Sequence, residues 1–311
     1  MLLNILFPIF AVVALGYFSA KTGFIQSALI TGMSQFVIKI ALPAFLLQAL
    51  ASKDLAQIWH PTYFLAYGLG SLLIYAIGFY LCRGYFKSSL TESSVLAVGG
   101  SMSNTGFIGT AVLTLLIGSH AAVYLSLTLI VENLLIVTLM MILAERGLHL
   151  RQDHHGQMLK DTLLRICKNP VILSIVLGIG CVLMGIKLPD VVAQTLKGIG
   201  LTASPLALFV IGASLMGMQF KQMNLQGISL VLIKGILMPL VIFGSLKLFG
   251  ADRETLYVGT LIAVLPMPIV FGIFAQYYGV QDKALPALVL STVFGFVITS
   301  IWLTQAVHYL S

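Results

Sequence analysis

A run of small and polar residues interrupts an apolar stretch at 98–109. These twelve residues include four glycines, two serines, an asparagine and a threonine, all of which are poor helix formers. Backbone groups freed from a helix in a membrane must find partners or line a polar cavity. The pattern predicts a broken helix whose amides bind a polar ligand together with Ser103, Asn104, Thr105 and Gly106. Close helix packing through glycine is the alternative, but it does not explain the clustered Ser-Asn-Thr.

A second apolar stretch is interrupted by prolines at Pro266 and Pro268, with Phe271 following them. Prolines two residues apart remove two backbone donors, and an uninterrupted helix does not tolerate them. A single kink is the alternative. Two facing breaks would aim the N-termini of two half-helices at one place, which suits an anionic group. The substrate class expected from this arrangement is an organic anion with a carboxylate.

Glu132 is the only acid deep within a predicted membrane span. Such a group is usually functional or paired. It is either a proton or sodium coupling site or a structural partner for Lys39, and Asn133 beside it is a candidate polar wall. Lys39 contacts the substrate or Glu132, or it extends its charge to the membrane surface. That last interpretation is favoured for Lys234, near a helix end. No cofactor or metal is expected beyond a coupling ion.

The composition explains why so few charges are available. Of 311 residues, 59% are hydrophobic and 9% charged, against about 25% charged in soluble domains, and the mean hydropathy is +1.03. These values exclude a soluble globular protein, a disordered chain and a nucleic-acid binder. No zinc-protease, nucleophile-elbow or phosphate-loop motif occurs, so we expect no enzyme.

Apolar segments with few or no charges predict an all-α membrane protein with ten transmembrane helices, each of about 20 residues. They lie near 2–20, 29–51, 62–82, 93–117, 121–144, 169–186, 198–220, 226–246, 255–277 and 284–309.

The distribution of basic residues sets the expected orientation. The 145–168 loop carries five basic residues. Because successive loops alternate between the two membrane faces, ten basic residues fall on the side of this loop and five on the other side. The loop is therefore predicted to be cytoplasmic, and both termini to lie outside. We expect an integral multi-pass protein of the bacterial inner (plasma) membrane.

Short matches recur at an offset of 162 residues. They relate Pro8 and Gly16 to Pro170 and Gly178, and Pro43 to Pro205. With five helices in each copy, the second copy must enter the membrane from the opposite side, as in secondary transporters. The predicted organisation is a first five-helix repeat at 1–144, a cytoplasmic basic loop at 145–168 and a second, inverted repeat at 169–311.

The chain resembles the auxin efflux carrier family, particularly its bacterial members. The resemblance is carried by stretches at 41–44, 103–109, 206–215, 234–240, 265–275 and 295–299, whose order and spacing together are specific. It implies a fold like that of the bile acid sodium symporters, with crossing helices four and nine. It also implies an elevator mechanism in a homodimer, with helices one, two, six and seven as the scaffold. Known members carry organic anions, including auxin in plants and malate or malonate in bacteria.

Two departures from the plant carriers favour a small carboxylate over auxin. Their prolines are replaced here by Ala111 in helix four and by Phe271 in helix nine, where Pro268 lies nearer the first proline. The expected function is secondary transport of a small organic anion by alternating access. A passive anion channel or facilitator is the alternative, and a ligand-binding membrane receptor is a weaker one.

Overall fold

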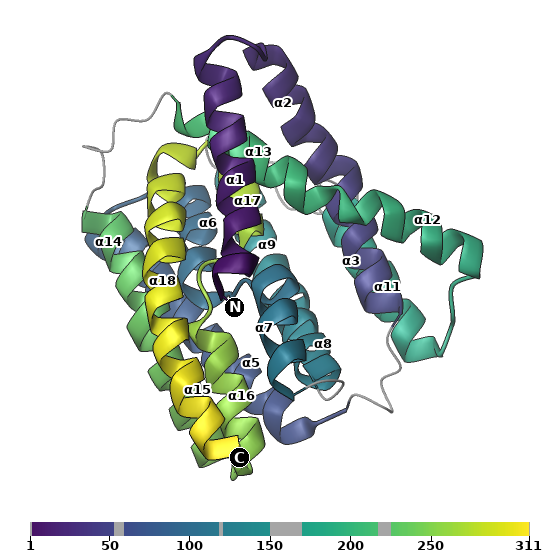
Figure 1. Cartoon of the computed structure of the whole chain (residues 1–311), viewed down its shortest axis with the longest axis vertical. Helices are drawn as coiled ribbons and strands as arrows, with labels where there is room; N and C mark the ends of the chain where they lie inside the picture. The colour runs from purple at the N-terminus through teal and green to yellow at the C-terminus, as the bar shows by residue number, and fades with distance from the viewer. Residues whose placement is uncertain (1, 53–58, 118–120, 150–169, 217–224, 311) are drawn as a thin grey trace.

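The computed structural model describes residues 2–52, 59–117, 121–149, 170–216 and 225–310, and nearly all of them lie in helices (Figure 1). This part of the chain contains no strand. The first half comprises α1 (Leu2–Lys21), α2 (Ser27–Phe36), η1 (Val37–Ala41), α3 (Leu42–Ala51), α5 (Pro61–Tyr80), η2 (Leu81–Tyr85), α6 (Leu90–Ser101), η3 (Thr105–Gly109), α7 (Thr110–Ile117), α8 (Ala121–Val131), η5 (Glu132–Val137) and α9 (Thr138–His149). Segments labelled η are π-helical turns.

The second half comprises α11 (Pro170–Met184), α12 (Asp190–Leu201), α13 (Ala203–Leu215), α14 (Leu225–Leu232), η7 (Ile233–Leu237), α15 (Met238–Leu248), α16 (Arg253–Val264), α17 (Ile269–Tyr277) and α18 (Gln281–Leu310). From residue 150 to its end, the expected 145–168 loop lies outside the described residues, while α9 continues through its first residues to His149.

The chain is a multi-pass membrane protein. Among the described residues, six helices are long and apolar enough to cross a membrane, or seven if α16 and α17 form one bent span. Two shorter apolar helices cover Ala11–Lys21 and Leu173–Met184. The count of ten spans therefore stays a prediction.

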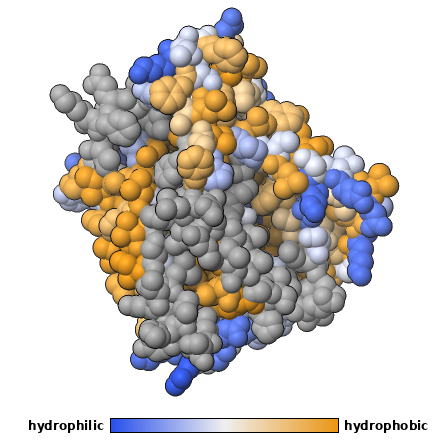
Figure 2. Space-filling model, viewed as in Figure 1, coloured by the Kyte–Doolittle hydropathy of each residue, from blue (hydrophilic) through white to orange (hydrophobic). Residues whose placement is uncertain are grey.

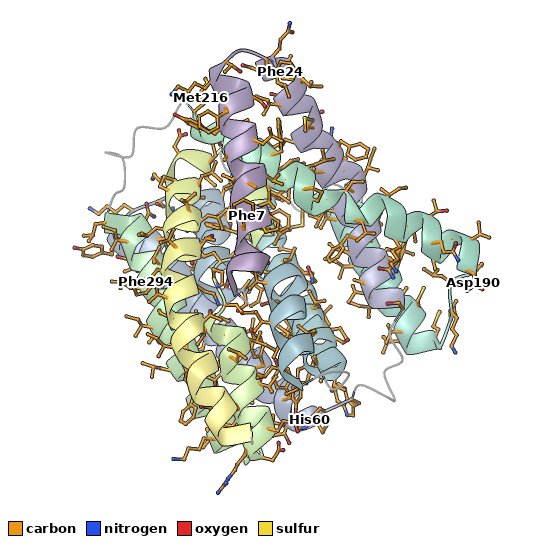
Figure 3. All side chains as sticks on the ribbon, in the orientation of Figure 1. Phe7, Phe24, His60, Asp190, Met216 and Phe294 are labelled. Atoms are coloured by element: carbon orange, nitrogen blue, oxygen red, sulfur yellow. The ribbon has the colours of Figure 1, made fainter. Side chains whose placement is uncertain are left out.

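The surface fits a lipid environment. Figure 2 shows apolar residues over much of the described surface, with polar residues gathered towards the two ends and beside α12. Large apolar side chains such as Phe7 and Phe24 point outward, and Phe24 and His60 lie at opposite ends of the molecule (Figure 3). In water such exposure would be unfavourable, whereas lipid tails accommodate it.

The helices form two groups (Figure 1). We call α1, α2–η1–α3, α11, α12 and α13 the side bundle, and α5 to α9 with α14 to α18 the main bundle. In the side bundle α1 packs along α13, and α3 packs against α11 and α12. The main bundle meets the side bundle where α17 contacts α13 and α2.

Glycines allow the closest helix contacts in the side bundle. A Cβ on Gly16 of α1 would collide with the backbone of Phe209, and one on Gly212 of α13 would collide with the backbone of Val13. A Cβ on Gly178 of α11 would collide with the side chain of Leu50. Small residues are the common means of close approach between membrane helices.

Two of the π-helical turns have a cause in the sequence. Pro43 and Pro239 follow η1 and η7 closely, each within the first two positions of the next helix. A proline lacks an N–H and its ring clashes with the carbonyl four residues before it. The preceding turn widens, so that the N–H of Leu42 bonds to Val37 O and the N–H of Met238 bonds to Ile233 O. The widened turns contain Lys39 and Lys234.

The glycine contacts generate a stability prediction. Gly212→Ala forces α1 away from α13, because its methyl group meets backbone that has no rotamer to change. We expect a loss of about 1–3 kcal/mol, measured as a lower midpoint of thermal unfolding in detergent. Gly244→Ala is the matched control, since a Cβ there meets nothing within 4 Å. Equal midpoints for the two variants would contradict the packing described here.

Candidate functional site

The first break in the main bundle lies between α6 and η3. Helix α6 begins with a capping box, in which the Ser89 hydroxyl accepts from the N–H of Glu92 and the Glu92 carboxylate accepts from the N–H of Ser89. It ends at Ser101, and Met102 is extended with φ −122° and ψ 156°. Helical backbone resumes at Thr105. The break thus falls within the stretch of small and polar residues that the sequence marks.

The second break lies between α16 and α17. The two helices are bent by 43° relative to each other, and Leu265 and Pro268 are both extended at the junction. Pro266 and Pro268 lack the N–H groups that a continuous helix requires. The sequence expectation of a break at these prolines agrees with the structure.

The two breaks meet each other. The backbone N–H of Asn104 donates to the carbonyl oxygen of Pro266 at 2.9 Å. The N–H of Met267 donates to Ser291 Oγ of α18 at 3.0 Å, and Gly295 leaves room for the Pro266 ring. These two backbone N–H groups released by the breaks are therefore paired with the other break or with a neighbouring helix, as an apolar environment requires.

A cavity of about 60 Å³ lies at this crossing, with room for a few water molecules. The first residues of both half-helices border it, Ser103 to Gly106 before and within η3 and Pro268 to Val270 at the start of α17. The remaining lining comes from Leu42, Phe45 and Leu46 of α3, Met102, Leu129, Glu132, Asn133, Ala203 and Ile273. The cavity is thus bordered by both bundles.

Glu132 supports the N-terminal end of η3. Its Oε1 accepts the backbone N–H of Ser103 at 2.7 Å and its Oε2 accepts the Thr105 hydroxyl at 3.2 Å. Its side chain is 1% exposed. A carboxylate at a helix N-terminus is stabilised by the N–H groups and by the helix dipole, so Glu132 is both a cap and a charged wall of the cavity.

Lys234 lies on the other side of Ser103. Its ammonium Nζ donates to Ser103 Oγ at 2.7 Å and to Ala263 O at 2.9 Å, and Met238 Sδ lies at 3.0 Å. Ala263 belongs to the last turn of α16, whose carbonyls attract a cation. Lys234 is 1% exposed. The membrane-surface orientation expected for it from the sequence is therefore wrong.

Lys39 is not near Glu132. It is exposed and lines a different cavity with Ser34, Gln276 and other residues of α2, α13, α17 and α18. The pairing of Lys39 with Glu132 that the sequence allowed is not formed. The structure brings Lys234 to this position because η7 faces both breaks, whereas η1 lies in the side bundle.

The remaining predicted residues divide between the cavity wall and its support. Asn104 is 5% exposed, and its side-chain amide makes no hydrogen bond to another described residue. Asn133 lines the cavity while its Nδ2 donates to Leu129 O at 2.7 Å. Pro266 and Phe271 do not line the cavity. Phe271 is fully buried, and its ring packs where Gly99 has no side chain.

Sequence reasoning missed the role of Lys234. Two signals were present, since Lys234 interrupts an apolar segment and stands five residues before Pro239. A proline at that distance is compatible with a π-helical turn, and such turns are frequent at functional sites. The position of Lys234 near the end of its predicted span, taken alone, favoured a side chain that reaches the membrane surface.

Comparison with known proteins agrees with a membrane transporter. Residues 1–303 match the family described as membrane transport protein. A putative malonate transporter of Rhizobium meliloti (strain 1021) is 24% identical over 298 residues, covering 93% of this chain and 90% of that protein. The uncharacterized transporter YfdV of Escherichia coli (strain K12) is 26% identical over 305 residues, covering 96% and 95%.

These relatives are transporters and not enzymes. The family match extends over almost the whole length, through both breaks and the residues around the cavity. The chain therefore belongs to the membrane transport protein family, the family of the auxin efflux carriers that its motifs resemble.

Proposed function

We propose that this protein is a secondary transporter of a small organic anion, with a carboxylate as the recognised group. The observation that carries the proposal is the cavity at which two half-helices begin. Helix N-termini favour anions because their N–H groups and dipoles present positive charge. In this proposal Asn104 donates from its side-chain amide to the substrate, and Ser103, Thr105, Gly106 and Pro268 complete the wall.

An inverted repeat of five plus five helices is part of the proposal. Asn104 and Pro266, which bond to each other, stand 162 residues apart, the offset of the sequence matches. The helix contacts are reciprocal at the same offset. Gly16 packs on Phe209, and Gly178 packs near the backbone of Leu47, so each partner pair corresponds to the other. A two-fold relation between the halves accounts for both observations.

The position of the cavity supports a proposal of alternating access. Its wall is shared by α3 and α13 of the side bundle and by the breaks of the main bundle. Sliding one bundle against the other would open the cavity first to one membrane face and then to the other. We propose an elevator movement with the side bundle as the scaffold, in a homodimer with the ten-helix fold of the bile acid sodium symporters.

The proposed substrate is a small mono- or dicarboxylate. One relative is named a putative malonate transporter, and the cavity of about 60 Å³ suits a small acid better than a bulky aromatic one. Glu132 is the proposed coupling site for a proton or a sodium ion, since its carboxylate lines the cavity.

The proposed setting is the bacterial inner membrane, with both termini outside and the 145–168 loop in the cytoplasm. Two considerations support it. If the ten predicted spans are correct, the basic residues are distributed ten to five in favour of the side of that loop, and the relatives are bacterial.

Transport itself is the first test. Purified protein in liposomes should take up labelled malonate or another small carboxylate, and unlabelled substrate inside should accelerate that uptake by counterflow. Counterflow is expected because a carrier binds its substrate on one side at a time. Fast anion conductance without counterflow would indicate a passive channel, and binding without any flux would indicate a receptor.

Asn104→Ala tests the site. It removes the side-chain amide but keeps the backbone N–H that bonds to Pro266, so the crossing should remain intact. A hydrogen bond to a charged group is worth about 1.5–3 kcal/mol, so we expect transport efficiency to fall by about 10- to 100-fold. Gln194→Ala removes an exposed amide of α12 and is the matched control. Unchanged transport by Asn104→Ala would show that the site lies elsewhere.

A further inference from the structure

The cavity presents an electrostatic problem for an anion. Glu132 is itself a wall of the cavity, and a carboxylate there repels a carboxylate substrate. Both oxygens of Glu132 accept hydrogen bonds, from Ser103 N–H and from the Thr105 hydroxyl, but hydrogen bonds do not remove its charge. An anion site that contains a buried acid needs either a compensating cation or a proton.

Lys234 is that cation, and Ser103 lies between it and the cavity. It does not line the cavity, yet its ammonium bonds to the hydroxyl of Ser103, whose backbone N–H bonds to Glu132. No direct ion pair joins Lys234 and Glu132. The other titratable groups in electrostatic contact with Glu132 are Tyr63 and Tyr67 of α5, and both are fully buried.

The arrangement also fixes what Ser103 can do. An ammonium group only donates hydrogen bonds, so Ser103 Oγ must accept from Lys234 and its own hydroxyl hydrogen points elsewhere. Ser103 lines the cavity, and its hydroxyl is then a donor polarised by a neighbouring cation. Such charge-assisted donors bind anions more strongly than neutral ones.

The hydrogen-bond network around Glu132 accommodates a proton. Thr105 Oγ1 lies 3.4 Å from Ser103 O as well as 3.2 Å from Glu132 Oε2. When Glu132 is protonated, its O–H can donate to Thr105 Oγ1 while the threonine hydroxyl donates to Ser103 O. The other oxygen still accepts from Ser103 N–H. A proton on Oε2 is therefore compatible with these contacts once the Thr105 hydroxyl rotates.

We propose that Lys234 makes anion binding depend on a proton at Glu132, so that the anion and one proton bind to the crossing together. This inference rests on the proposed transport function. With Glu132 ionised the charges of the pair cancel, and the anion is attracted only by the N–H groups and dipoles of the helix ends. With Glu132 protonated the site carries the single positive charge of Lys234. By linkage, anion binding must then favour proton uptake to the same degree that the proton favours the anion.

Proton uptake on binding is the direct measurement. Malonate is titrated calorimetrically into purified protein in detergent, in buffers of different ionisation enthalpy and with choline in place of sodium. We expect uptake approaching one proton per malonate at alkaline pH, and an affinity that falls by about tenfold per pH unit there. Glu132→Gln mimics the protonated acid, so its affinity should not fall with pH. Protons taken up by malonate itself are counted equally in wild type and in Glu132→Gln. The difference between the two proteins therefore gives the uptake that depends on Glu132.

Lys234→Gln is the second variant. It should weaken malonate binding by about tenfold or more, which corresponds to about 1.4 kcal/mol. The double variant Glu132→Gln, Lys234→Gln should bind weakly and without pH dependence. Lys247→Gln removes an exposed lysine and is the control. Even if a variant fails to fold, a wild-type protein that binds malonate without taking up a proton would overturn the linkage.

The outcomes separate this inference from the proposed function. If malonate is transported but wild type and Glu132→Gln take up equal numbers of protons, the linkage is wrong and the transport function stands. An affinity that requires sodium and ignores pH would also overturn the linkage. If neither malonate nor other small carboxylates bind or are transported, the proposed function fails, and the inference fails with it.

Discussion

The hydrogen bond from Asn104 N–H to Pro266 O satisfies the constraint on which the site depends. Inside a membrane, a helix can be broken only where the freed backbone groups find partners. Each break alone would leave donors and carbonyls exposed to an apolar environment. Placed against each other, the breaks satisfy part of that need and leave a small cavity between them. The binding site that we propose is thus a consequence of how the backbone groups at the two breaks are paired.

Two charged side chains pair with helix-end backbone groups that the contact between the breaks leaves without a backbone partner. Glu132 accepts the N–H of Ser103 at the start of one half-helix, and Lys234 donates to Ala263 O near the end of α16. Each charge matches the sign that a helix end favours. Neither residue could be replaced by an apolar one without leaving helix-end groups unpaired. The groups that stabilise the crossing are therefore also those that determine the charge of the cavity.

The sequence predicted the positions of both breaks and the helical class, and it singled out Glu132 as an unusual buried acid. Glycine, proline and clustered polar residues act locally, so their effects can be read without the fold. The partner of Glu132 could not be predicted in this way. Lys39 and Lys234 each interrupt an apolar segment near a proline, and only the packing of η7 against the breaks, with η1 in the side bundle, distinguishes them.

In the inverted repeat that we propose, the charged residues at the crossing are less symmetric than the arrangement of the helices. At the offset of 162, Glu132 corresponds to Phe294 and Lys234 corresponds to Leu72. Each half thus contributes one charge to the crossing, and neither half has both. Symmetry of the backbone would provide two exchangeable conformations of similar energy. A single pair of opposite charges gives one site, and a proton at Glu132 changes its net charge by one. The duplicated fold would thus supply the movement, and the two unmatched residues the coupling.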